Sequence, residues 1–251
     1  MDIKTKFSDK VKDLEASAIR EIFKLLDKPG IISFAGGAPD PELFPCDELS
    51  EVAADVLKNN GKIALQYGVT EGYAPLRDWV KNRLVSQGIV KENDNNETII
   101  VSGGQQGIDL ASKSLLNPGD AVVCEQPSFI GGLNCFRSYN AEIYGVKVQS
   151  DGIDMEELEA LLKQHSNIKI LYTIATFQNP SGITMSLEKR KKLLELAEQY
   201  DFMIFEDNPY GELRFAGDDV PTIKSLDTQG RVVYLGSFSK ILSPGIRVGF
   251  T

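Results

Sequence analysis

Cysteine and histidine are scarce in this sequence. Its 251 residues include three cysteines, at positions 46, 124 and 135, and one histidine. An odd number of widely spaced cysteines does not build a disulfide framework, and the close pairs of a structural zinc site are missing. The scarcity therefore argues against a secreted disulfide-rich protein and against a metal centre, and it favours a reducing compartment.

Long apolar runs and clustered positive charge are also missing. No stretch approaches the ~18 apolar residues needed to span a bilayer, and the first residues contain no apolar signal core. The net charge of −9 opposes binding to DNA or to anionic membranes. The basic run Lys189 to Lys192 stands between Glu188 and Glu195, which predicts a solvated helix face. We therefore expect a soluble cytoplasmic protein with no nucleic-acid or membrane partner.

Two common nucleotide-binding motifs are absent as well. Neither the dinucleotide spacing Gly-x-Gly-x-x-Gly nor the lysine-containing P-loop occurs. The sequence has instead the string Ser102-Gly-Gly-Gln-Gln-Gly107, which follows a predicted strand and opens a predicted helix. Free backbone N–H groups at such a helix start can hold a phosphate. Taken alone, the string does not identify a ligand.

From residue 98 onward, short β-type runs alternate with helical segments. The predicted strands are 98–102, 121–125, 142–148, 169–174, 202–206, 231–235 and 247–251, and the predicted helices are 105–116, 155–164 and 187–200. Asp154 and Glu157 have the spacing of a capping box at the start of the second helix. Such alternation is typical of a parallel sheet covered on both faces. We expect an α/β protein with a three-layer α/β/α domain and a mostly parallel seven-stranded sheet.

The first third of the chain predicts helices and a glycine-containing turn. Apolar residues at three- and four-residue steps predict a helix over residues 8–27, with Arg20 on its other face. Similar patterns that begin near Leu49 and Tyr73 predict two further helices. The segment Ile31 to Pro41 contains two adjacent glycines, which allow the backbone to turn sharply or to approach a ligand closely.

Polar residues follow the predicted strands at the edge where parallel sheets bind ligands. In chain order they are an aromatic ring at Phe129, an amide at Asn179, a carboxylate at Asp207, a phenol at Tyr210 and an amine at Lys240. A lysine amine can form a Schiff base with a carbonyl, and Ser237, Ser239 and Arg247 can bind phosphate oxygens. A buried carboxylate needs a cationic partner, such as a protonated heterocyclic nitrogen. Each residue alone has an ordinary structural explanation, but the set indicates a site for an anionic carbonyl compound.

Three segments resemble the signatures of fold-type-I pyridoxal-phosphate aminotransferases of classes I and II. They are Asn179-Pro-Ser-Gly182, Asp207-Asn-Pro-Tyr210, and Ser237-Phe-Ser-Lys240 followed by Arg247. The resemblance runs from about Leu14 to the last residue. It implies transamination between an α-amino acid and a 2-oxo acid, pyridoxal 5'-phosphate as cofactor, and a sheet whose last strand is antiparallel.

The resemblance also implies a role for each site residue. Lys240 would hold the cofactor as an internal aldimine and then shuttle a proton, Asp207 would keep the pyridine nitrogen protonated, and Tyr210 would hydrogen-bond the phenolic oxygen of the ring. Asn179 would share that oxygen and lie beside the substrate, and Phe129 would stack on the ring. The phosphate would be held by Gly104, Gln105, Ser237, Ser239 and Arg247, and by Tyr67 from the neighbouring subunit of a homodimer.

The N-terminal residues are similar to the 2-aminoadipate and kynurenine aminotransferase subgroup, in the segments Ser17 to Arg20 and Pro29 to Pro45. In that subgroup the first helix is mobile and covers the substrate. Arg20 would then bind a distal carboxylate of the substrate, or else lie on a solvated helix face, and Gly37 would pass close to the α-carboxylate. Residues 1–45 would form the N-terminal helix and substrate-covering segment, and residues 46–251 the cofactor-binding large domain.

The sequence departs from the family pattern in two places. Phe129 stands where many relatives carry tyrosine, which keeps the stacking surface but removes a hydroxyl. The sequence also stops soon after Lys240, without the C-terminal small domain whose arginine binds the substrate α-carboxylate. We therefore expect a partial enzyme with impaired substrate binding.

Three other functions remain open from the sequence. They are a carbon–sulfur lyase that uses the same cofactor, the effector domain of a pyridoxal-phosphate-dependent transcription regulator, and a catalytically silent remnant that binds the cofactor. A regulator would need an N-terminal DNA-binding module, and the ~30 residues before Ile31 are too few for a winged helix of ordinary domain size. Transamination is therefore the leading hypothesis.

Overall fold

The computed structural model of the protein describes residues 3–8, 10 and 37–251. Most of the predicted helix over residues 8–27, including Arg20, lies outside the described residues. The described part begins with a short 3-10 helix, η1 (Ile3–Lys6), and resumes at Gly37 before a second one, η2 (Pro41–Leu43). Within this part of the chain, no helix is long and apolar enough to cross a membrane.

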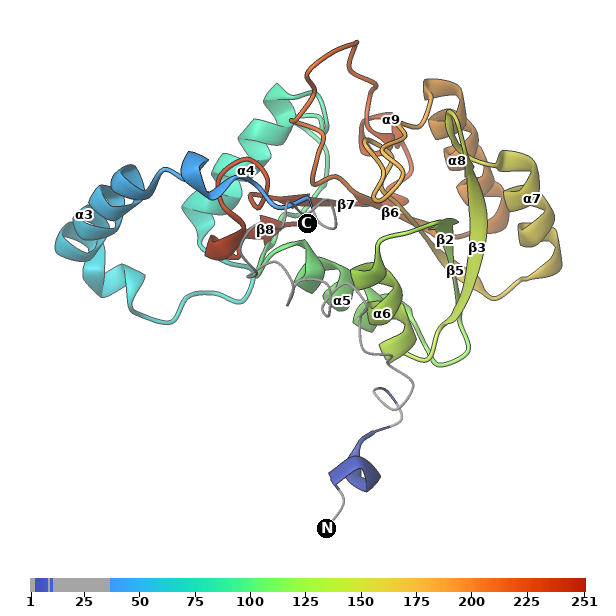
Figure 1. Ribbon diagram of the computed structural model, residues 1–251, viewed down its shortest axis with the longest axis horizontal. Coiled ribbons are helices and arrows are strands. Elements are labelled where there is room, and N and C mark those ends of the chain that lie inside the picture. Colours follow the sequence, from blue (N-terminus) through green and yellow to red (C-terminus); the bar gives the residue numbers. More distant parts are fainter. Residues whose placement is uncertain (1–2, 9, 11–36) are drawn as a thin grey trace, which may run out of the picture.

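A mixed sheet forms the centre of the fold (Figure 1). Its strands are β1 (Ile100–Val101), β2 (Ala121–Gln126), β3 (Glu142–Gln149), β4 (Gly152–Ile153), β5 (Ile168–Thr173), β6 (Met203–Asp207), β7 (Val232–Ser237) and β8 (Gly249–Phe250). They lie in the order β1-β8-β7-β6-β5-β2-β3-β4. Strands β3, β2, β5, β6 and β7 are parallel neighbours, and β8 runs antiparallel to β7 and β1. The predicted fold class and the antiparallel last strand are confirmed.

The sheet has eight strands where the sequence predicts seven. The additional strand, β4, has two residues and pairs antiparallel with the end of β3. A run this short has no periodicity to detect. The predicted strand over residues 247–251 shortens to two residues, because Arg247 has a left-handed φ of 52° and cannot continue an extended strand.

Helices cover both faces of the sheet (Figure 1). Helices α5 (Gly104–Leu115) and α6 (Ile130–Ser138) pack on one face, and α7 (Met155–Gln164), α8 (Leu187–Tyr200) and α9 (Ile223–Leu226) pack on the other. Successive strand residues point to opposite faces. The core divides accordingly, since Val122 and Ile170 pack with α5 and α6, whereas Val123 and Leu171 pack with α7 and α8. The strands are therefore apolar on both faces, as expected for a covered parallel sheet.

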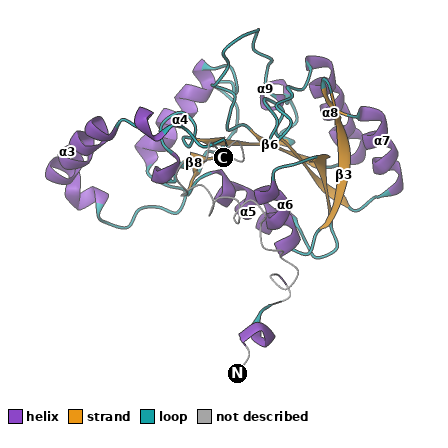
Figure 2. Cartoon of the chain, viewed as in Figure 1, coloured by secondary structure: helices purple, strands orange, loops and turns teal. Residues whose placement is uncertain are grey.

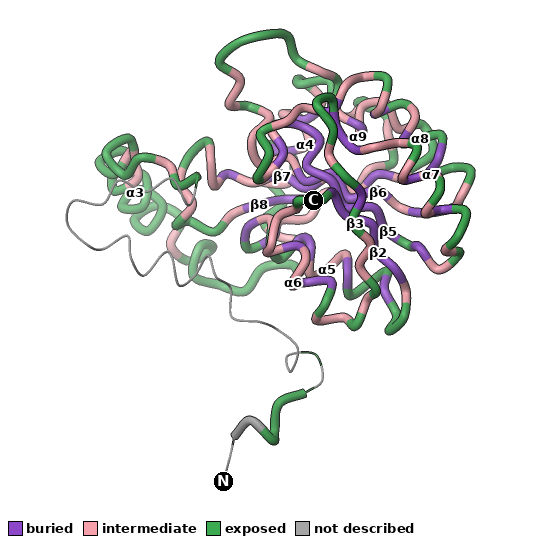
Figure 3. The backbone as a smooth tube through the Cα atoms, turned by 45° about the vertical axis from the view of Figure 1, so that its right-hand side comes forward, coloured by how far each residue is buried: buried purple, intermediate pink, exposed green. Residues whose placement is uncertain are grey.

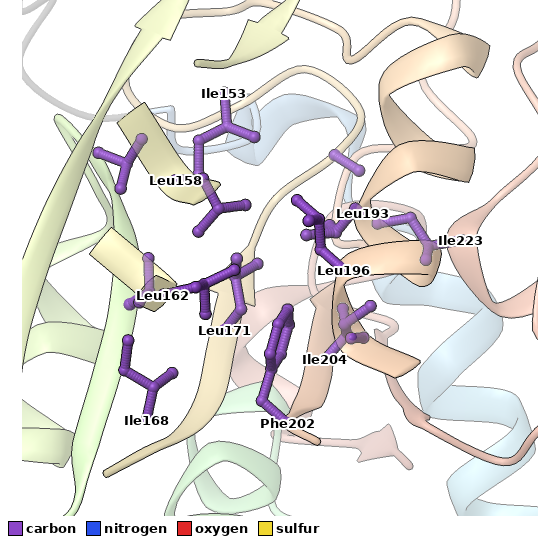
Figure 4. Close-up of a cluster of buried hydrophobic side chains, with 14 of the residues drawn as sticks. Ile153, Leu158, Leu162, Ile168, Leu171, Leu193, Leu196, Phe202, Ile204 and Ile223 are labelled. Carbon is purple, nitrogen blue, oxygen red and sulfur yellow. The ribbon is translucent and has the colours of Figure 1, made fainter. Parts of the chain in front are cut away.

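Figure 4 shows the core cluster on the α7 and α8 face. Leu158 and Leu162 of α7 and Leu193 and Leu196 of α8 meet the strand residue Leu171, and all five side chains are buried. Full burial of one such side chain contributes about 1.5–3 kcal/mol. The apolar spacing that predicts these two helices is thus also what fixes them to the sheet.

The predicted capping box at the start of α7 is half formed. The Asp154 carboxylate accepts hydrogen bonds from the backbone N–H groups of Glu156 (3.0 Å) and Glu157 (3.1 Å). In place of the reciprocal bond, the Glu157 carboxylate accepts from the backbone N–H of Lys147 in β3 at 3.0 Å. Glu157 therefore ties α7 to the neighbouring strand.

Helix α6 is not predicted from the sequence, because a glycine pair in its first turn disfavours a helix. The structure shows what the pair permits. A Cβ atom on Gly131 would lie 2.5 Å from the Phe129 ring, and one on Gly132 would lie 3.1 Å from the Tyr172 ring. The two glycines therefore let α6 approach the sheet and keep Phe129 close to the helix start.

Helix α3 (Cys46–Ala64) is predicted correctly, but its apolar residues are not buried. It extends away from the body of the protein (Figures 1 and 3). Its exposed apolar side chains include Val52, Leu57 and Ile63. Helix α4 (Ala74–Ser86), in contrast, buries Val80 and Leu84 in a third core cluster beside β8.

Candidate functional site

The candidate site lies at the carboxyl edge of the parallel strands. The segments that follow β5, β6 and β7 are loops, coloured teal in Figure 2. Because these three strands are parallel neighbours, their carboxyl ends adjoin one another. Asn179, Asp207 and Lys240 stand at or just beyond these three ends, as the sequence predicts.

Lys240 follows β7 and is half-buried. Its Nζ donates a hydrogen bond to the Gly37 carbonyl at 2.8 Å and lies 5.9 Å from the centre of the Tyr210 ring. Burial lowers the pKa of the Lys240 amine below its ordinary value. The structure thus brings together three of the predicted site residues, and it makes the amine easier to deprotonate than a surface lysine.

Asp207 is the last residue of β6 and is buried. The Tyr172 hydroxyl donates to its Oδ2 at 2.7 Å. Its Oδ1 accepts no hydrogen bond from the described residues, and it lies 4.0 Å from the position of a Cβ atom built on Gly104. Burial raises the pKa of Asp207 to about 6, although the Tyr172 hydrogen bond opposes this. The carboxylate therefore faces the start of α5 with an oxygen free for a ligand.

Asn179 and Tyr210 meet beside the lysine. The Asn179 side-chain amide donates to the Tyr210 hydroxyl at 3.4 Å. Tyr210 packs against the core cluster of α5 and α6, which also receives Phe129. Burial raises the pKa of the Tyr210 phenol. The phenol, the amide and the aromatic ring predicted from three separate loops therefore line one region.

The start of α5 forms an open cradle of backbone N–H groups. Gly103 precedes the helix with φ +81°, a conformation that favours glycine. The N–H groups of Gly104 and Gln105 find no acceptor among the described residues. The Arg247 guanidinium lies against Gly103, so close that a Cβ there would be 2.3 Å from its Nη2. The positive N-terminal end of α5 and the Arg247 guanidinium together favour the binding of an anion.

The two predicted hydroxyl groups of the cradle interact with each other. The Ser237 hydroxyl donates to the Ser239 Oγ at 2.8 Å, and the Ser239 backbone N–H donates to the Ser237 Oγ at 3.1 Å. The Gln105 side-chain amide instead donates to the Gly131 carbonyl at 3.0 Å, so Gln105 offers its backbone N–H to a ligand. The cradle observed at the start of α5 therefore consists of backbone N–H groups and the Arg247 guanidinium, and the two serines bond to each other.

Two predicted site residues are not near this region or are not described. Tyr67 lies on the loop after α3, with 98% of its surface exposed. Arg20 lies outside the described residues. Within one chain, therefore, the described site consists of Gly37 and the residues at the strand ends.

Sequence reasoning missed Tyr172, whose hydroxyl bonds to Asp207. Tyr172 lies inside an apolar strand, where an aromatic residue is read as core. Its role depends on register, because Tyr172 pairs with Phe205, two residues before Asp207 and on the same face. Only the pairing of β5 with β6 could have revealed the contact.

These features define a three-layer α/β domain with an amine, a carboxylate and an anion cradle at the edge where such sheets bind ligands. The chain belongs to the class I and II aminotransferase family, whose family model matches residues 29–251.

Three relatives illustrate the similarity. Aromatic-amino-acid aminotransferase 1 of Thermococcus litoralis is 44% identical over 100% of this chain and 61% of its own length. The 2-aminoadipate transaminase of Thermus thermophilus is 42% identical over 94% of this chain and 58% of its own length. A crystal structure of Pyrococcus horikoshii kynurenine aminotransferase, in complex with PMP, superposes with a TM-score of 0.93 at 42% identity, covering 99% of this chain and 62% of that one. The chain thus spans about 60% of the length of these relatives.

Proposed function

We propose that the protein is the cofactor-binding part of a pyridoxal 5'-phosphate-dependent aminotransferase that acts on an α-amino acid and a 2-oxo acid. The observation that carries this proposal is the convergence of Lys240, Asp207 and the α5 cradle on one edge of the sheet. When bound, pyridoxal 5'-phosphate supplies a reactive carbonyl and an electron-withdrawing ring.

The residues present fit this cofactor. Its phosphate needs hydrogen-bond donors, and the Gly104 and Gln105 N–H groups have no acceptor among the described residues. Its ring nitrogen, when protonated, is a cation, and the buried residue Asp207 has a carboxylate oxygen, Oδ1, that accepts no hydrogen bond from the described residues. Its carbonyl needs an amine of lowered pKa, which Lys240 provides. The α5 N–H groups, the Asp207 carboxylate and the Lys240 amine thus match the phosphate, the ring nitrogen and the carbonyl of one molecule.

Each side chain then has a defined task. Lys240 would hold the cofactor covalently and, once released, take up and return the proton at the substrate Cα. Asp207 would hold a proton on the ring nitrogen, because a buried carboxylate stays ionised beside a cation. Asn179 and Tyr210 would donate to the phenolic oxygen, and Phe129 would exclude water from one face of the ring.

The phosphate contacts follow from the cradle. The α5 N-terminus, Ser237, Ser239 and Arg247 would bind its oxygens, and the Arg247 charge would add a charge-assisted hydrogen bond. These donors come from the start of α5 and from one stretch, the end of β7 and its connection to β8, so the phosphate would also fix that connection relative to the helix. Substrate recognition would involve Gly37, Asn179 and Arg20, with residues 1–45 as a covering segment and residues 46–251 as the large domain.

Exposure on α3 supports a homodimer. Helix α3 buries none of its residues, and the apolar Leu65 and Tyr67 beyond its end are 80% and 98% exposed. A second copy of the chain would cover these side chains, and its Tyr67 would then reach the phosphate. A cytoplasmic location fits a protein that would act on free amino acids and carries three unpaired cysteines.

Borohydride trapping tests the proposal. The purified protein is mixed with pyridoxal 5'-phosphate and reduced, and the labelled lysine is mapped by mass spectrometry. Label is expected on Lys240 and is lost in Lys240→Ala. Lys224 is the matched internal control, because burial also lowers its pKa although it lies in α9. Label on Lys224, or none, would overturn the site assignment.

A second measurement separates a working site from a silent one. After loading, the protein is mixed with candidate amino acids, and conversion of the cofactor to its pyridoxamine form is followed by absorbance. Conversion supports an aminotransferase, whereas binding without conversion supports a remnant. The high identity to named aminotransferases favours transamination over the regulator alternative.

A further inference from the structure

Two loops at the carboxyl edge are joined by a buried pair of side chains outside the site described above. One loop follows β2 and leads to Phe129, and the other follows β5 and leads to Asn179. Glu125 is the penultimate residue of β2, which leads into the first loop, and Gln178 lies in the second loop, 53 residues away in sequence. The Gln178 Nε2 donates to the Glu125 Oε2 at 3.1 Å.

Both ends of the Gln178 side-chain amide are fully hydrogen-bonded, the nitrogen to the β2 side and the oxygen to its own loop. Only 2% of the Gln178 surface is exposed. Besides Glu125, its Nε2 donates to the Pro127 carbonyl at 2.8 Å. Its Oε1 accepts from the Ser181 backbone N–H at 2.8 Å and from the Ser181 hydroxyl at 2.6 Å. The Gln178 amide therefore bonds to the backbone of both loops. Its partner Pro127 lies two residues before Phe129, and its partner Ser181 lies two residues after Asn179.

Glu125 anchors this amide to the sheet. It is 4% exposed and accepts from the Thr173 hydroxyl at 2.5 Å and from the Ile174 backbone N–H at 3.2 Å, at the end of β5. Burial raises its pKa to about 7, and its hydrogen bonds oppose that shift. The carboxyl group thus spans the ends of β2 and β5, with each oxygen engaged.

We propose that Glu125 and Gln178 are positioning residues that set the placement of Phe129 relative to Asn179, and so the plane in which the cofactor ring is held. This inference rests on the proposed function. Phe129 would contact a face of the ring and Asn179 an atom on its edge, so the distance between the two loops fixes both contacts at once. Both positioning residues are buried below the surface of the site, with 4% of Glu125 and 2% of Gln178 exposed.

A polar pair suits this task better than an apolar one. Apolar side chains of similar volume would fill the space with comparable stability, but their contacts are non-directional and would not fix the orientation of the loop backbone. Hydrogen bonds to the Pro127 carbonyl and the Ser181 N–H fix the backbone of each loop in one orientation. A buried amide without these partners would cost free energy, so the loops cannot shift without breaking the pair.

The variant Gln178→Leu tests the inference in the full chain. It removes both donors and the acceptor at nearly constant volume. We expect the dissociation constant for pyridoxal 5'-phosphate to rise about tenfold or more, and the visible circular dichroism of the bound cofactor to weaken, because this signal requires a fixed ring orientation. Gln149→Leu is the control, since Gln149 at the end of β3 also bonds at both ends of its amide, but it is exposed and joins neither of the two loops.

A second pair of variants separates geometry from charge. Glu125→Gln keeps the hydrogen bonds, because the Thr173 hydroxyl can accept as well as donate. Its dissociation constant and circular dichroism should stay close to those of the wild type, whereas Glu125→Leu should resemble Gln178→Leu. An equal loss in Glu125→Gln and Glu125→Leu would overturn the positioning role.

The outcomes distinguish this inference from the proposed function. A wild type without label on Lys240 would overturn both. A labelled wild type, with Gln178→Leu unchanged in affinity and in circular dichroism, would overturn only the inference. If Gln178→Leu does not fold, Ser181→Ala replaces it, because that change removes one of the two bonds to the Gln178 Oε1. Its dissociation constant should rise about threefold, and an unchanged value would count against the pair.

Discussion

The last two residues of β6 carry carboxyl groups that face opposite sides of the sheet. Glu206 points toward α8 and α9, where it accepts from the backbone N–H groups of Ile223 (2.9 Å) and Lys224 (2.8 Å), and the buried Arg190 guanidinium lies 3.9 Å away. Asp207 points toward α5 and accepts one hydrogen bond from the described residues, donated by Tyr172. Both groups are buried, and burial raises both pKa values.

The difference between the two groups is the number of donors that the chain supplies. Glu206 has backbone donors and a counter-charge, so its burial is compensated by the fold itself. Asp207 has one neutral donor, which leaves part of its desolvation uncompensated. Asp207, with too few partners, is therefore suited to bind a cationic ligand. Glu206, with a full set of partners, stabilises the fold.

Loss of Glu206 should have the largest effect on stability. Glu206→Ala leaves Arg190 buried without its counter-charge and removes the acceptor at the start of α9. We expect the free energy of unfolding to fall by about 3–5 kcal/mol, measured by urea denaturation. A loss below about 1 kcal/mol would show that the two carboxyl groups do not differ in the way described here.

Loss of the Asp207 charge should affect chemistry instead. Asp207→Asn keeps the shape, but an amide cannot hold the ring nitrogen in its protonated form. The rate of cofactor conversion with an amino acid should fall about a hundredfold or more, or about 2.7 kcal/mol in the barrier. The free energy of unfolding at neutral pH should not fall, because the variant removes a buried charge whose pKa is raised. Stopped-flow absorbance and urea denaturation provide the two readouts, and a variant that keeps the wild-type rate would contradict the assigned role.

The pH dependence of stability should reveal the uncompensated carboxyl group. The pKa of Asp207 is about 6 in the folded protein, above the ordinary value of 3.8. Between these values the folded state holds more protons than the unfolded state, so stability should fall as pH rises from about 4 to about 6 and then level off. The Asp207 share should be about 3 kcal/mol, at about 1.36 kcal/mol for each pKa unit.

Asp207→Asn is the control for this measurement, because it should remove that share and leave the contributions of Glu125 and Glu206 in place. Cofactor binding should also flatten the curve, since a cationic nitrogen lowers the pKa of Asp207. An identical pH profile for wild type and variant would contradict the assignment.

The smallest expected effect concerns Gly103. Gly103→Ala adds a Cβ at φ +81°, 2.3 Å from the Arg247 Nη2, whereas Gly230→Ala adds one at φ +72° in open space. Both should lose about 1–2 kcal/mol of stability from backbone strain, but only Gly103→Ala should displace Arg247 and weaken cofactor binding. Isothermal titration checks the affinity, and equal affinities in both variants would show that the cradle tolerates the displacement.

The sequence predicts where the site residues lie in the sheet, but it does not predict the partners of the two β6 carboxyl groups. Runs of β-branched residues place Asp207 at a strand end, and the turn residues place Asn179 and Lys240 beyond two others, so the edge of the sheet can be anticipated. The partners of Glu206 and Asp207 cannot, because they depend on strand register and on contacts across many residues. Arg190 illustrates this, since it belongs to a basic run predicted on a solvated helix face, yet its side chain is fully buried. Only the approach of α8 to the loop before α9 creates its pocket.

The pairing of β1 with β8 has a consequence for the order of events in folding. These strands come from opposite ends of the sheet-forming sequence, and the cradle likewise joins residue 103 to residue 247. Contacts this distant in sequence close late, because the intervening chain must first be ordered. The anion site is then complete only after β8 has docked against β7 and β1. Any phosphate compound that binds there would stabilise the state with β8 docked over states in which it is undocked, by mass action.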